Sequence, residues 1–252
     1  MSGDAEHDAP SEVAELISAM PRPALLVFDC DGVLAPLVDH ADDSQLMEGT
    51  GELLATLARR DDTTVAILSG RSLAGLAQFD FDESIVVAGS YGGERRGFGT
   101  PELSDAESTL LARLDEITVE AAELAGTGAW VERKPTSVVV HVREAGPEHR
   151  AGALEHARTR GSAVTGSEVH EGDNVVELMA RPIDKGAGLD RLRDDLRAAS
   201  VLYVGDDVPD ERAFARLAGA HDVGVKVGPG DTVAGRRLAG PDEVREMLRL
   251  LA

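Results

Sequence analysis

Short apolar runs along the chain alternate with longer stretches in which apolar residues recur at helical spacing. Each short run is followed directly by Asp, Ser or Gly. Uninterrupted apolar runs of this kind are typical of strands buried on both faces of a parallel sheet. We expect such strands at 24–28, 64–68, 85–88, 201–204 and 223–227, and helices at 11–20 (capped by Ser11), 52–60, 185–198, 210–218 and 244–251.

The middle of the chain has a different pattern. Its apolar residues alternate with polar ones, which favours a sheet with one solvated face. We expect helices at 104–124 and 147–160 and strands at 129–132, 137–142, 163–170 and 175–179. The predicted fold class is therefore α/β: a doubly wound, Rossmann-like core with an inserted α+β cap domain. The predicted divisions are 1–101 (core, first part), 102–181 (cap) and 182–252 (core, second part).

The composition of the chain limits its possible cellular compartment and its possible binding partners. No apolar run is long enough to span a bilayer, the first ten residues lack the pattern of a secretory signal, and Cys30 is the single cysteine. We therefore expect a cytoplasmic protein. The formal net charge of −21 disfavours binding to nucleic acid or anionic membranes. The same charge repels phosphorylated ligands, so a site that binds one would need local cations and a metal.

Three polar clusters follow predicted strands, at 29–32, 69–71 and 205–207. Ligands of open α/β sheets bind beyond the carboxyl ends of the strands, so we expect these clusters to meet at one edge. Asp29 and Asp31 suit a nucleophile and a general acid/base, and Gly32 permits the tight turn between them. Asp206 and Asp207 offer oxygen ligands of the kind that Mg²⁺ prefers.

Two further side chains complete this candidate site. Ser69 can donate a hydrogen bond to a phosphoryl oxygen, and Lys185, at the start of a predicted helix, can add a positive charge. Taken singly, each cluster is also compatible with a surface turn, a loop or the acidic start of a helix. The occurrence of all of them in this order favours a metal-dependent phosphatase.

These motifs resemble those of the haloacid dehalogenase superfamily. The segments are 27–34, 69–71, Lys185 and 205–207. The resemblance implies that Asp29 is the nucleophile and Asp31 the general acid/base. It implies Mg²⁺ bound by Asp29, by the main-chain carbonyl of Asp31 and by Asp206, with Asp207 or Asp210 assisting. Phosphoryl binding would fall to Ser69 and Lys185, with Gly70 and Arg71 in the same substrate-binding loop.

A narrower resemblance, from about residue 24 to 251, is to the trehalose-phosphatases. It rests on segments 31–36, 205–214 and 225–228, and on cap residues that resemble the sugar-binding segments of that family. It implies hydrolysis of trehalose 6-phosphate, with sugar contacts from Glu132, Lys134, Arg143 and Glu177. Without the resemblance, Glu132 and Lys134 would be interpreted as a charged pair on a solvated strand.

Other functions stay open at this point. Pro209 and Tyr91 stand where trehalose-phosphatases commonly have threonine and histidine, so the substrate could instead be sucrose phosphate, glucosylglycerol phosphate or a mannosylglycerate-type phosphate. A non-catalytic sugar-phosphate sensor is a further alternative, although a sensor has no need of a nucleophile. We expect a monomer whose small-molecule ligand is a sugar phosphate, with trehalose-phosphate synthase as a candidate protein partner.

Overall fold

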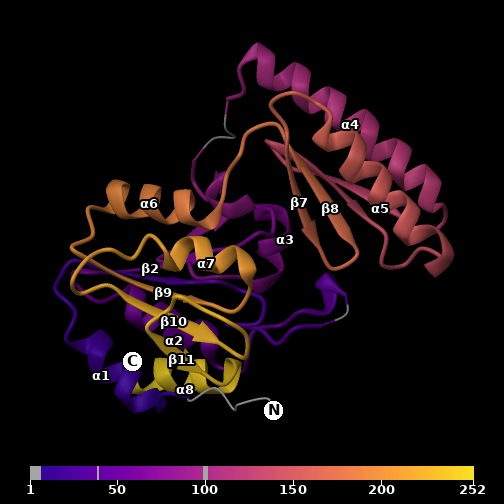
Figure 1. Ribbon diagram of the computed structural model, residues 1–252. Coiled ribbons are helices and arrows are strands. Elements are labelled where there is room, and N and C mark those ends of the chain that lie inside the picture. The colour runs from indigo at the N-terminus through magenta and orange to yellow at the C-terminus, as the bar shows by residue number, and fades with distance from the viewer. Residues whose placement is uncertain (1–6, 39, 99–101) are drawn as a thin grey trace. The chain divides into compact units, whose positions relative to one another are not determined.

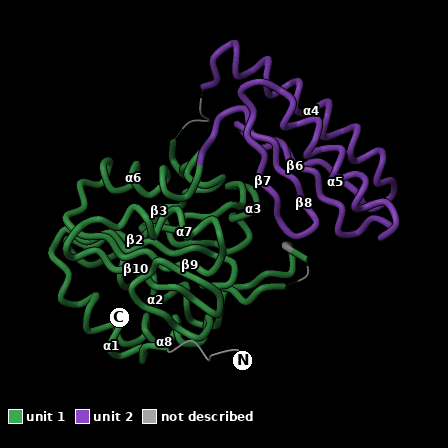
Figure 2. The backbone as a smooth tube through the Cα atoms, in the orientation of Figure 1, with its two compact units in different colours: residues 1–98, 184–252 green, residues 99–183 purple. Residues whose placement is uncertain are grey.

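The computed structural model describes residues 7–38, 40–98 and 102–252. It divides into two compact units, shown in different colours in Figure 2. The core unit comprises residues 1–98 and 184–252, and the cap unit comprises residues 99–183. Of the two expected division points, Arg181 lies three residues before Asp184, where the core unit resumes, and Pro101 lies outside the described residues.

A seven-stranded sheet forms the centre of the core unit (Figure 1), with the strand order β11-β10-β9-β1-β2-β3-β4. Every neighbouring pair is parallel except β3 and β4. The order reverses direction on either side of β1, which confirms the doubly wound topology expected from the sequence. The strands are β1 (Ala24–Phe28), β2 (Thr63–Leu68), β3 (Val86–Gly89), β4 (Glu94–Arg95), β9 (Ser200–Gly205), β10 (Val223–Val227) and β11 (Arg236–Leu238).

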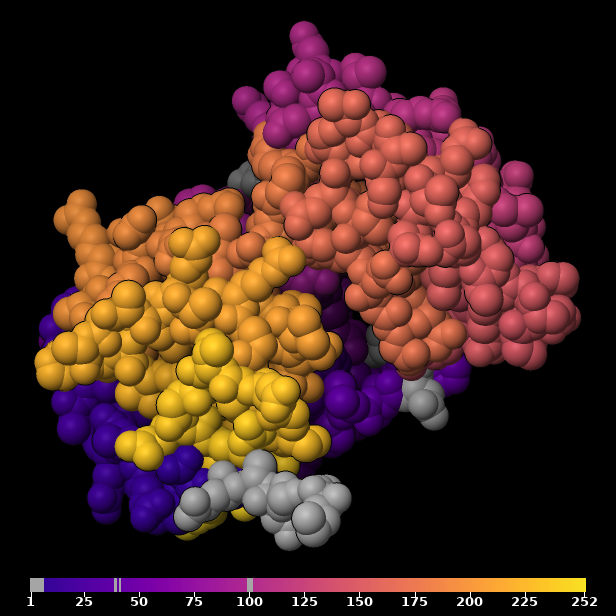
Figure 3. Space-filling view, viewed as in Figure 1, coloured from indigo at the N-terminus to yellow at the C-terminus, as the bar shows by residue number. Residues whose placement is uncertain are grey.

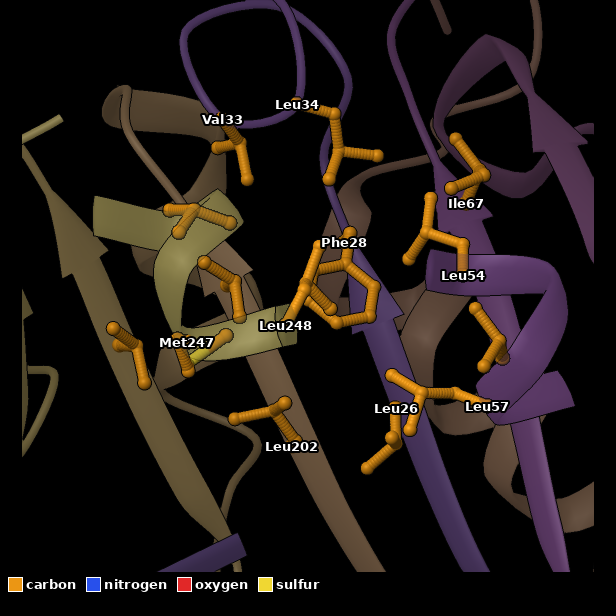
Figure 4. Close-up of a cluster of buried hydrophobic side chains, with 14 of the residues drawn as sticks. Leu26, Phe28, Val33, Leu34, Leu54, Leu57, Ile67, Leu202, Met247 and Leu248 are labelled. Atoms are coloured by element: carbon orange, nitrogen blue, oxygen red, sulfur yellow. The ribbon is translucent and has the colours of Figure 1, made fainter. Parts of the chain in front are cut away.

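Helices cover both faces of this sheet. On one face, Leu26 and Phe28 of β1 pack in one cluster with α1 (Pro10–Ser18), α2 (Thr50–Ala58) and α8 (Pro241–Leu251), as Figure 4 shows in part. On the other face, Leu25 and Val27 pack with α6 (Lys185–Leu196) and α7 (Val208–Phe214). In the space-filling view, residues 185–252 form much of the core surface on the side shown (Figure 3). The remaining short elements are η1 (Ala41–Asp43), α3 (Leu73–Leu76), η2 (Ala77–Phe79) and η3 (Ser90–Gly92).

The cap unit is a four-stranded antiparallel sheet with the order β5-β6-β8-β7. Helices α4 and α5 lie side by side over one of its faces (Figure 1), where their apolar residues pack against those of the strands. This arrangement confirms the inserted α+β unit. Its elements are α4 (Asp105–Ala125), β5 (Trp130–Arg133), β6 (Ser137–His141), α5 (Pro147–Ser162), β7 (Glu168–Gly172) and β8 (Val175–Met179).

The strand expected at 163–170 is wrong in its first half. Helix α5 continues to Ser162, and a turn containing Gly166, at φ +88°, precedes β7. Ser167 closes this turn, because its hydroxyl lies within hydrogen-bonding distance of the main-chain oxygens of Gly161 and Val164. The apolar residues Ala163 and Val164 suggested a strand, yet they belong to the end of the helix and its turn.

The N-terminal cap of α1 is also different from the prediction. Ala9, not Ser11, is the capping residue, and Pro10 is the first residue of the helix. Proline is favoured at this position because its fixed φ suits a helix and its missing N–H needs no partner. Ser11 therefore lies inside the first turn, where the Ala9 amide donates to Glu12 Oε2 at 3.2 Å.

Across the described ranges, none of the helices is both long enough and apolar enough to cross a membrane.

Candidate active site

The loops after β1 and β9 meet at the carboxyl edge of the core sheet. These strands are neighbours, and the Asp29 amide donates a hydrogen bond of 2.9 Å to the Val204 carbonyl. Gly32 lies in the left-handed region at φ +74°, and a Cβ atom there would come within 1.9 Å of Asp206 Oδ2. Only glycine therefore allows the two loops to approach so closely. The first and last of the three polar clusters are brought together.

Lys185 is the centre of a buried ionic cluster. As the first residue of α6 it is 3 % exposed, and its Nζ lies 2.6 Å from both Asp29 Oδ2 and Asp210 Oδ1. Asp210 also accepts a 2.6 Å hydrogen bond from the Tyr203 hydroxyl and 3.0 Å bonds from the amides of Asp206 and Asp207. With its two oxygens accepting from four donors, Asp210 holds Lys185 and the loop after β9 in place.

The protonation of this cluster is strongly affected by its surroundings. Burial raises the pKa of Asp29 to about 8, with Asp210 and Asp206 adding to the shift and Lys185 opposing it. Burial likewise raises the pKa of Asp206 to about 7, again with Asp210 contributing. Burial disfavours the charged form of Lys185, but Asp210 and Asp29 outweigh it and raise the pKa of the ammonium. The site thus has more negative charge than its lysine neutralises.

The chemistry of these residues fits a divalent cation. Among the described residues, Asp29, Asp206 and Asp210 each offer an oxygen within 4.8 Å of the others. Three carboxylates share the ammonium of Lys185, with Lys226 also acting on Asp206, and the donors are all oxygens, as Mg²⁺ prefers. Because Asp210 already accepts four hydrogen bonds, Asp29 and Asp206 are better suited to bind the cation directly. Asp207 is outside this group and caps α7, its Oδ1 accepting from the Val208 amide at 2.7 Å.

Asp31 lies in a second group together with residues of the loop after β2. Arg71 binds it through two bonds, Nε to Oδ2 at 2.6 Å and Nη2 to Oδ1 at 2.7 Å, and the Ser44 hydroxyl donates to Oδ1 at 3.1 Å. Ser69, 2 % exposed, accepts from the Arg71 amide at 3.2 Å. A Cβ on Gly70 would come within 2.8 Å of the Tyr91 ring, so a larger residue here would have to displace that ring. Asp31, Ser69 and Arg71 are thereby held as one unit.

Three of the four predicted sugar-binding residues lie on strands of the cap sheet or directly after one. Glu177 Oε1 accepts from Lys134 Nζ at 3.2 Å and from the Ser137 hydroxyl at 2.5 Å, and Glu132 Oε2 lies 3.1 Å from His141 Nε2. The fourth, Arg143, lies beyond the end of β6 and pairs with Asp173 at 2.8 Å.

Tyr203 and Ser44 belong to these groups although no motif contains them. Tyr203 lies within the apolar strand that precedes residues 205–207, and it is completely buried. A buried hydroxyl needs a hydrogen-bond partner. A tyrosine within a buried strand, two residues before the segment 205–207, was therefore the feature of the sequence that could have identified Tyr203. Ser44 follows a polar stretch, and nothing in its sequence context distinguishes it from a surface serine.

The fold, the buried cluster around Lys185 and the second group around Asp31 together define a phosphatase of the haloacid dehalogenase type, with an α+β cap inserted into a doubly wound core. Within that class, the family model described as trehalose-phosphatase matches residues 27–239. The chain therefore belongs to the trehalose-phosphatase family.

Individual relatives agree with this family. The trehalose-6-phosphate phosphatase of Escherichia coli (strain K12) is 28 % identical over 226 residues, which cover 89 % of this chain and 85 % of that protein. The trehalose-phosphate phosphatase of Mycobacterium marinum is 34 % identical over 249 residues, covering 92 % of this chain but 62 % of that protein. The chain thus spans less than two thirds of the mycobacterial relative.

A solved structure shows the same fold. The C-terminal domain of the C. albicans trehalose-6-phosphate phosphatase superposes with a TM-score of 0.79 at 23 % identity, covering 97 % of each chain. At that identity the likeness concerns the fold alone.

Proposed function

We propose that this protein hydrolyses trehalose 6-phosphate to trehalose and inorganic phosphate. The observation that carries the proposal is the position of Asp29. Its carboxylate lies at the carboxyl end of β1, 2.6 Å from the buried ammonium of Lys185, and within 4.8 Å of ligand oxygens of Asp206 and Asp210. Family membership supplies the substrate, since relatives of this chain bear the name trehalose-6-phosphate phosphatase.

The reaction divides into two displacements. An oxygen of Asp29 attacks phosphorus, the bond to the sugar oxygen breaks, and an aspartyl-phosphate forms. Asp31 gives a proton to the departing sugar oxygen. It then accepts a proton from the water that attacks the aspartyl-phosphate, which releases inorganic phosphate and regenerates Asp29. Two easier steps thereby replace one very slow hydrolysis.

The remaining residues position these groups and offset charge. Lys185 holds Asp29 and provides a positive charge beside the transferred phosphoryl group, and Ser69 donates a hydrogen bond to one of its oxygens. Arg71 orients Asp31 through its two bonds. Asp29, Asp206 and the main-chain carbonyl of Asp31 would hold Mg²⁺, which would supply Lewis-acid stabilisation of the phosphoryl oxygens.

Substrate selection is proposed to come from the cap. Glu132, Lys134 and Glu177 place carboxylate and ammonium groups on or next to one sheet, where they can hydrogen-bond sugar hydroxyls. Arg143, whose guanidinium pairs with Asp173 in the structure, is proposed as a fourth contact.

A panel of phosphate-release assays tests this function. It compares trehalose 6-phosphate with sucrose phosphate, glucosylglycerol phosphate, a mannosylglycerate-type phosphate and a generic aryl phosphate, each with Mg²⁺ and with a chelator. We expect the highest kcat/KM for trehalose 6-phosphate, loss of all release with chelator, and recovery on adding Mg²⁺. If trehalose 6-phosphate is turned over no faster than the aryl phosphate, the assigned substrate is wrong.

We further propose that the protein acts as a cytoplasmic monomer and that trehalose-phosphate synthase is its protein partner. One structural neighbour, the C-terminal domain of the Candida albicans trehalose synthase regulatory protein, shares the fold with a TM-score of 0.68 at 14 % identity. Light scattering after size-exclusion chromatography, with and without the synthase, tests both points. A dimer without the synthase, or no complex with it, contradicts the corresponding proposal.

A further inference from the structure

The cap sheet carries an aromatic side chain that the proposed mechanism does not use. Trp130, on β5, is the single tryptophan of the chain, and the segment 99–183 contains no other Phe, Tyr or Trp. It is nevertheless 51 % exposed. Leaving a large aromatic surface in water forgoes the free energy that its burial would provide, so a ligand or partner that covers it would gain affinity.

His141 holds the indole of Trp130 in a fixed orientation. The two residues are directly paired across β5 and β6, and their rings stack with centroids 3.8 Å apart and planes only 2° from parallel. His141 is itself held by Glu132, through a contact of 3.1 Å between Nε2 and Oε2. Because His141 covers one face of the indole, the exposed half of Trp130 includes surface away from that stack.

Trp130 lies on the sheet face that the cap helices do not cover. Arg133 and Val140 are on the helical side, since Arg133 bridges to Asp115 of α4 at 2.7 Å and Val140 belongs to the apolar cluster under α4 and α5. Side chains alternate between the faces along a strand, and directly paired residues share a face. Trp130, Glu132 and His141 therefore lie on the opposite face. Glu177 is on that face too, because it pairs with Val139, two residues from His141.

This juxtaposition matches the chemistry of a pyranose ring. Such a ring has a flat apolar C–H face and a rim of hydroxyls, so it is recognised by an aromatic plane with carboxylates beside it. Trp130 and Glu132 are two residues apart on β5, which separates their Cα atoms by about 7 Å, close to the width of a pyranose. A ring stacked on the indole would thus have its hydroxyls beside a carboxylate.

We propose that Trp130, backed by His141, stacks on a glucosyl ring of the substrate and is a specificity-determining residue of the cap. The inference rests on the proposed function, since it takes the sugar from there. It adds an apolar contact to the polar contacts of Glu132, Lys134 and Glu177. It also gives His141 a role, namely to hold the indole and not to bind the sugar itself.

Fluorescence tests the contact directly, because Trp130 is the single tryptophan. The Asp29→Asn variant, which is expected to bind substrate without turnover, is titrated with trehalose 6-phosphate, with trehalose, and with mannitol as a polyol control. We expect a saturable change in tryptophan emission with the first two compounds and no saturable change with mannitol. Trehalose binding is checked separately by its inhibition of phosphate release by the wild type. If trehalose inhibits but tryptophan emission stays unchanged, the inference is overturned.

Kinetics of two substitutions provide the second test. Trp130→Ala is expected to lower kcat/KM for trehalose 6-phosphate by about tenfold, mainly through KM, which corresponds to about 1.4 kcal/mol. Its kcat/KM for an aryl phosphate should stay as in the wild type. Trp130→Phe, which keeps an aromatic plane, should recover most of the loss. Phe98→Ala, at another exposed aromatic with 65 % exposure, is the matched control and should change neither value.

The outcomes separate this inference from the proposed function. If the wild type prefers trehalose 6-phosphate but Trp130→Ala keeps that preference, the stacking is wrong and the function stands. If the wild type itself shows no preference, the assigned substrate is wrong, and the fluorescence titration with trehalose then decides on the stacking alone. Should Trp130→Ala fail to fold, Trp130→Phe and the titration of Asp29→Asn still decide the question.

Discussion

The polar groups of the core and those of the cap differ in how many of them are exposed to solvent. In the core, Lys185 of α6 and Asp210 of α7 are buried beside Asp29, which follows β1, and one ammonium bonds two carboxylates. In the cap, Lys134 and Glu177 form a buried pair, but Glu132 and Trp130 on the same antiparallel sheet are partly exposed. The core arrangement gives rigid electrostatics for a reaction at phosphorus, and the cap arrangement gives a surface suited to hydroxyls and an apolar ring.

This difference has a consequence for mutations. A change in the buried core cluster should affect every phosphate ester equally, because all share the phosphoryl group. A change on the cap sheet should affect only substrates that carry the sugar. The following experiments test that division, from the largest expected effect to the smallest.

Asp29→Asn should remove essentially all phosphate release from every substrate. The uncatalysed reaction is so slow, with known accelerations of up to about 10²¹-fold, that loss of the nucleophile leaves no measurable rate. Phosphate release and circular dichroism together check that activity, and not folding, is lost. Asp195→Asn, at a half-exposed side chain of α6 that pairs with Arg95, is the control and should keep full activity. Turnover by Asp29→Asn would show that Asp29 is not the nucleophile.

Lys185→Met should abolish turnover and lower the free energy of unfolding by about 3–5 kcal/mol, because Asp29 and Asp210 lose the cation that they share. Urea unfolding at neutral pH measures the second effect. Tyr203→Phe is the graded control: it removes one hydrogen bond to Asp210 and should cost about 1–2 kcal/mol. Equal destabilisation by both variants would show that Lys185 does not hold the cluster together.

Glu177→Gln should lower kcat/KM for trehalose 6-phosphate by about 10- to 150-fold and leave the aryl phosphate unaffected. The substitution keeps the shape of the side chain but removes the charge that faces Lys134, and a hydrogen bond to a charged group contributes about 1.5–3 kcal/mol. In parallel, Asp173→Asn removes the negative charge that pairs with Arg143. It tests whether the sugar contact proposed for Arg143 depends on that pair. A parallel loss on the aryl phosphate would remove the distinction between core and cap.

Glu107→Gln should have the smallest effect, and one that depends on pH. Hydrogen bonds from Arg181 and Ser104 lower the pKa of Glu107 from 4.5 to about 2. A lowered pKa in the folded state stabilises the protein above the unfolded value, so this contribution is complete above pH 4.5 and disappears as the pH falls towards 2. The difference in urea midpoint between wild type and variant should therefore shrink over that range. A difference that is constant with pH would contradict this account.

Much of the fold follows from local patterns. The buried strands β1, β2 and β9 are read directly from apolar runs, because a strand covered on both faces needs apolar residues throughout. By contrast, β4 and β11 contain mostly charged residues, Glu94-Arg95 and Arg236-Arg237-Leu238, and become strands only because a neighbour offers them hydrogen bonds. The strand expected at 163–170 was misplaced for a related reason: Ala163 and Val164 are apolar because they belong to the end of α5 and its turn, and not because they lie in a strand.

The candidate active site, like the fold, could be predicted from the sequence only in part. Asp29, Asp31 and Asp206 could be identified from the sequence because each follows a strand end within a short motif, and parallel strands bring their carboxyl ends to one edge. The four bonds that hold Asp210, and the pairing of Asp31 with Arg71, could not be predicted. They depend on side-chain directions across different loops, which no spacing along the chain specifies.

By itself, then, the sequence determined the alternating architecture, the acidic motifs at its strand ends and the family to which they belong, because these features depend on periodicity and on neighbours along the chain. Only the tertiary structure decided that Lys185 joins Asp29 to Asp210 and that Trp130 stacks on His141. Those contacts join residues far apart in sequence, and they arise from strand register and helix packing, which are settled when the whole chain buries its apolar surface.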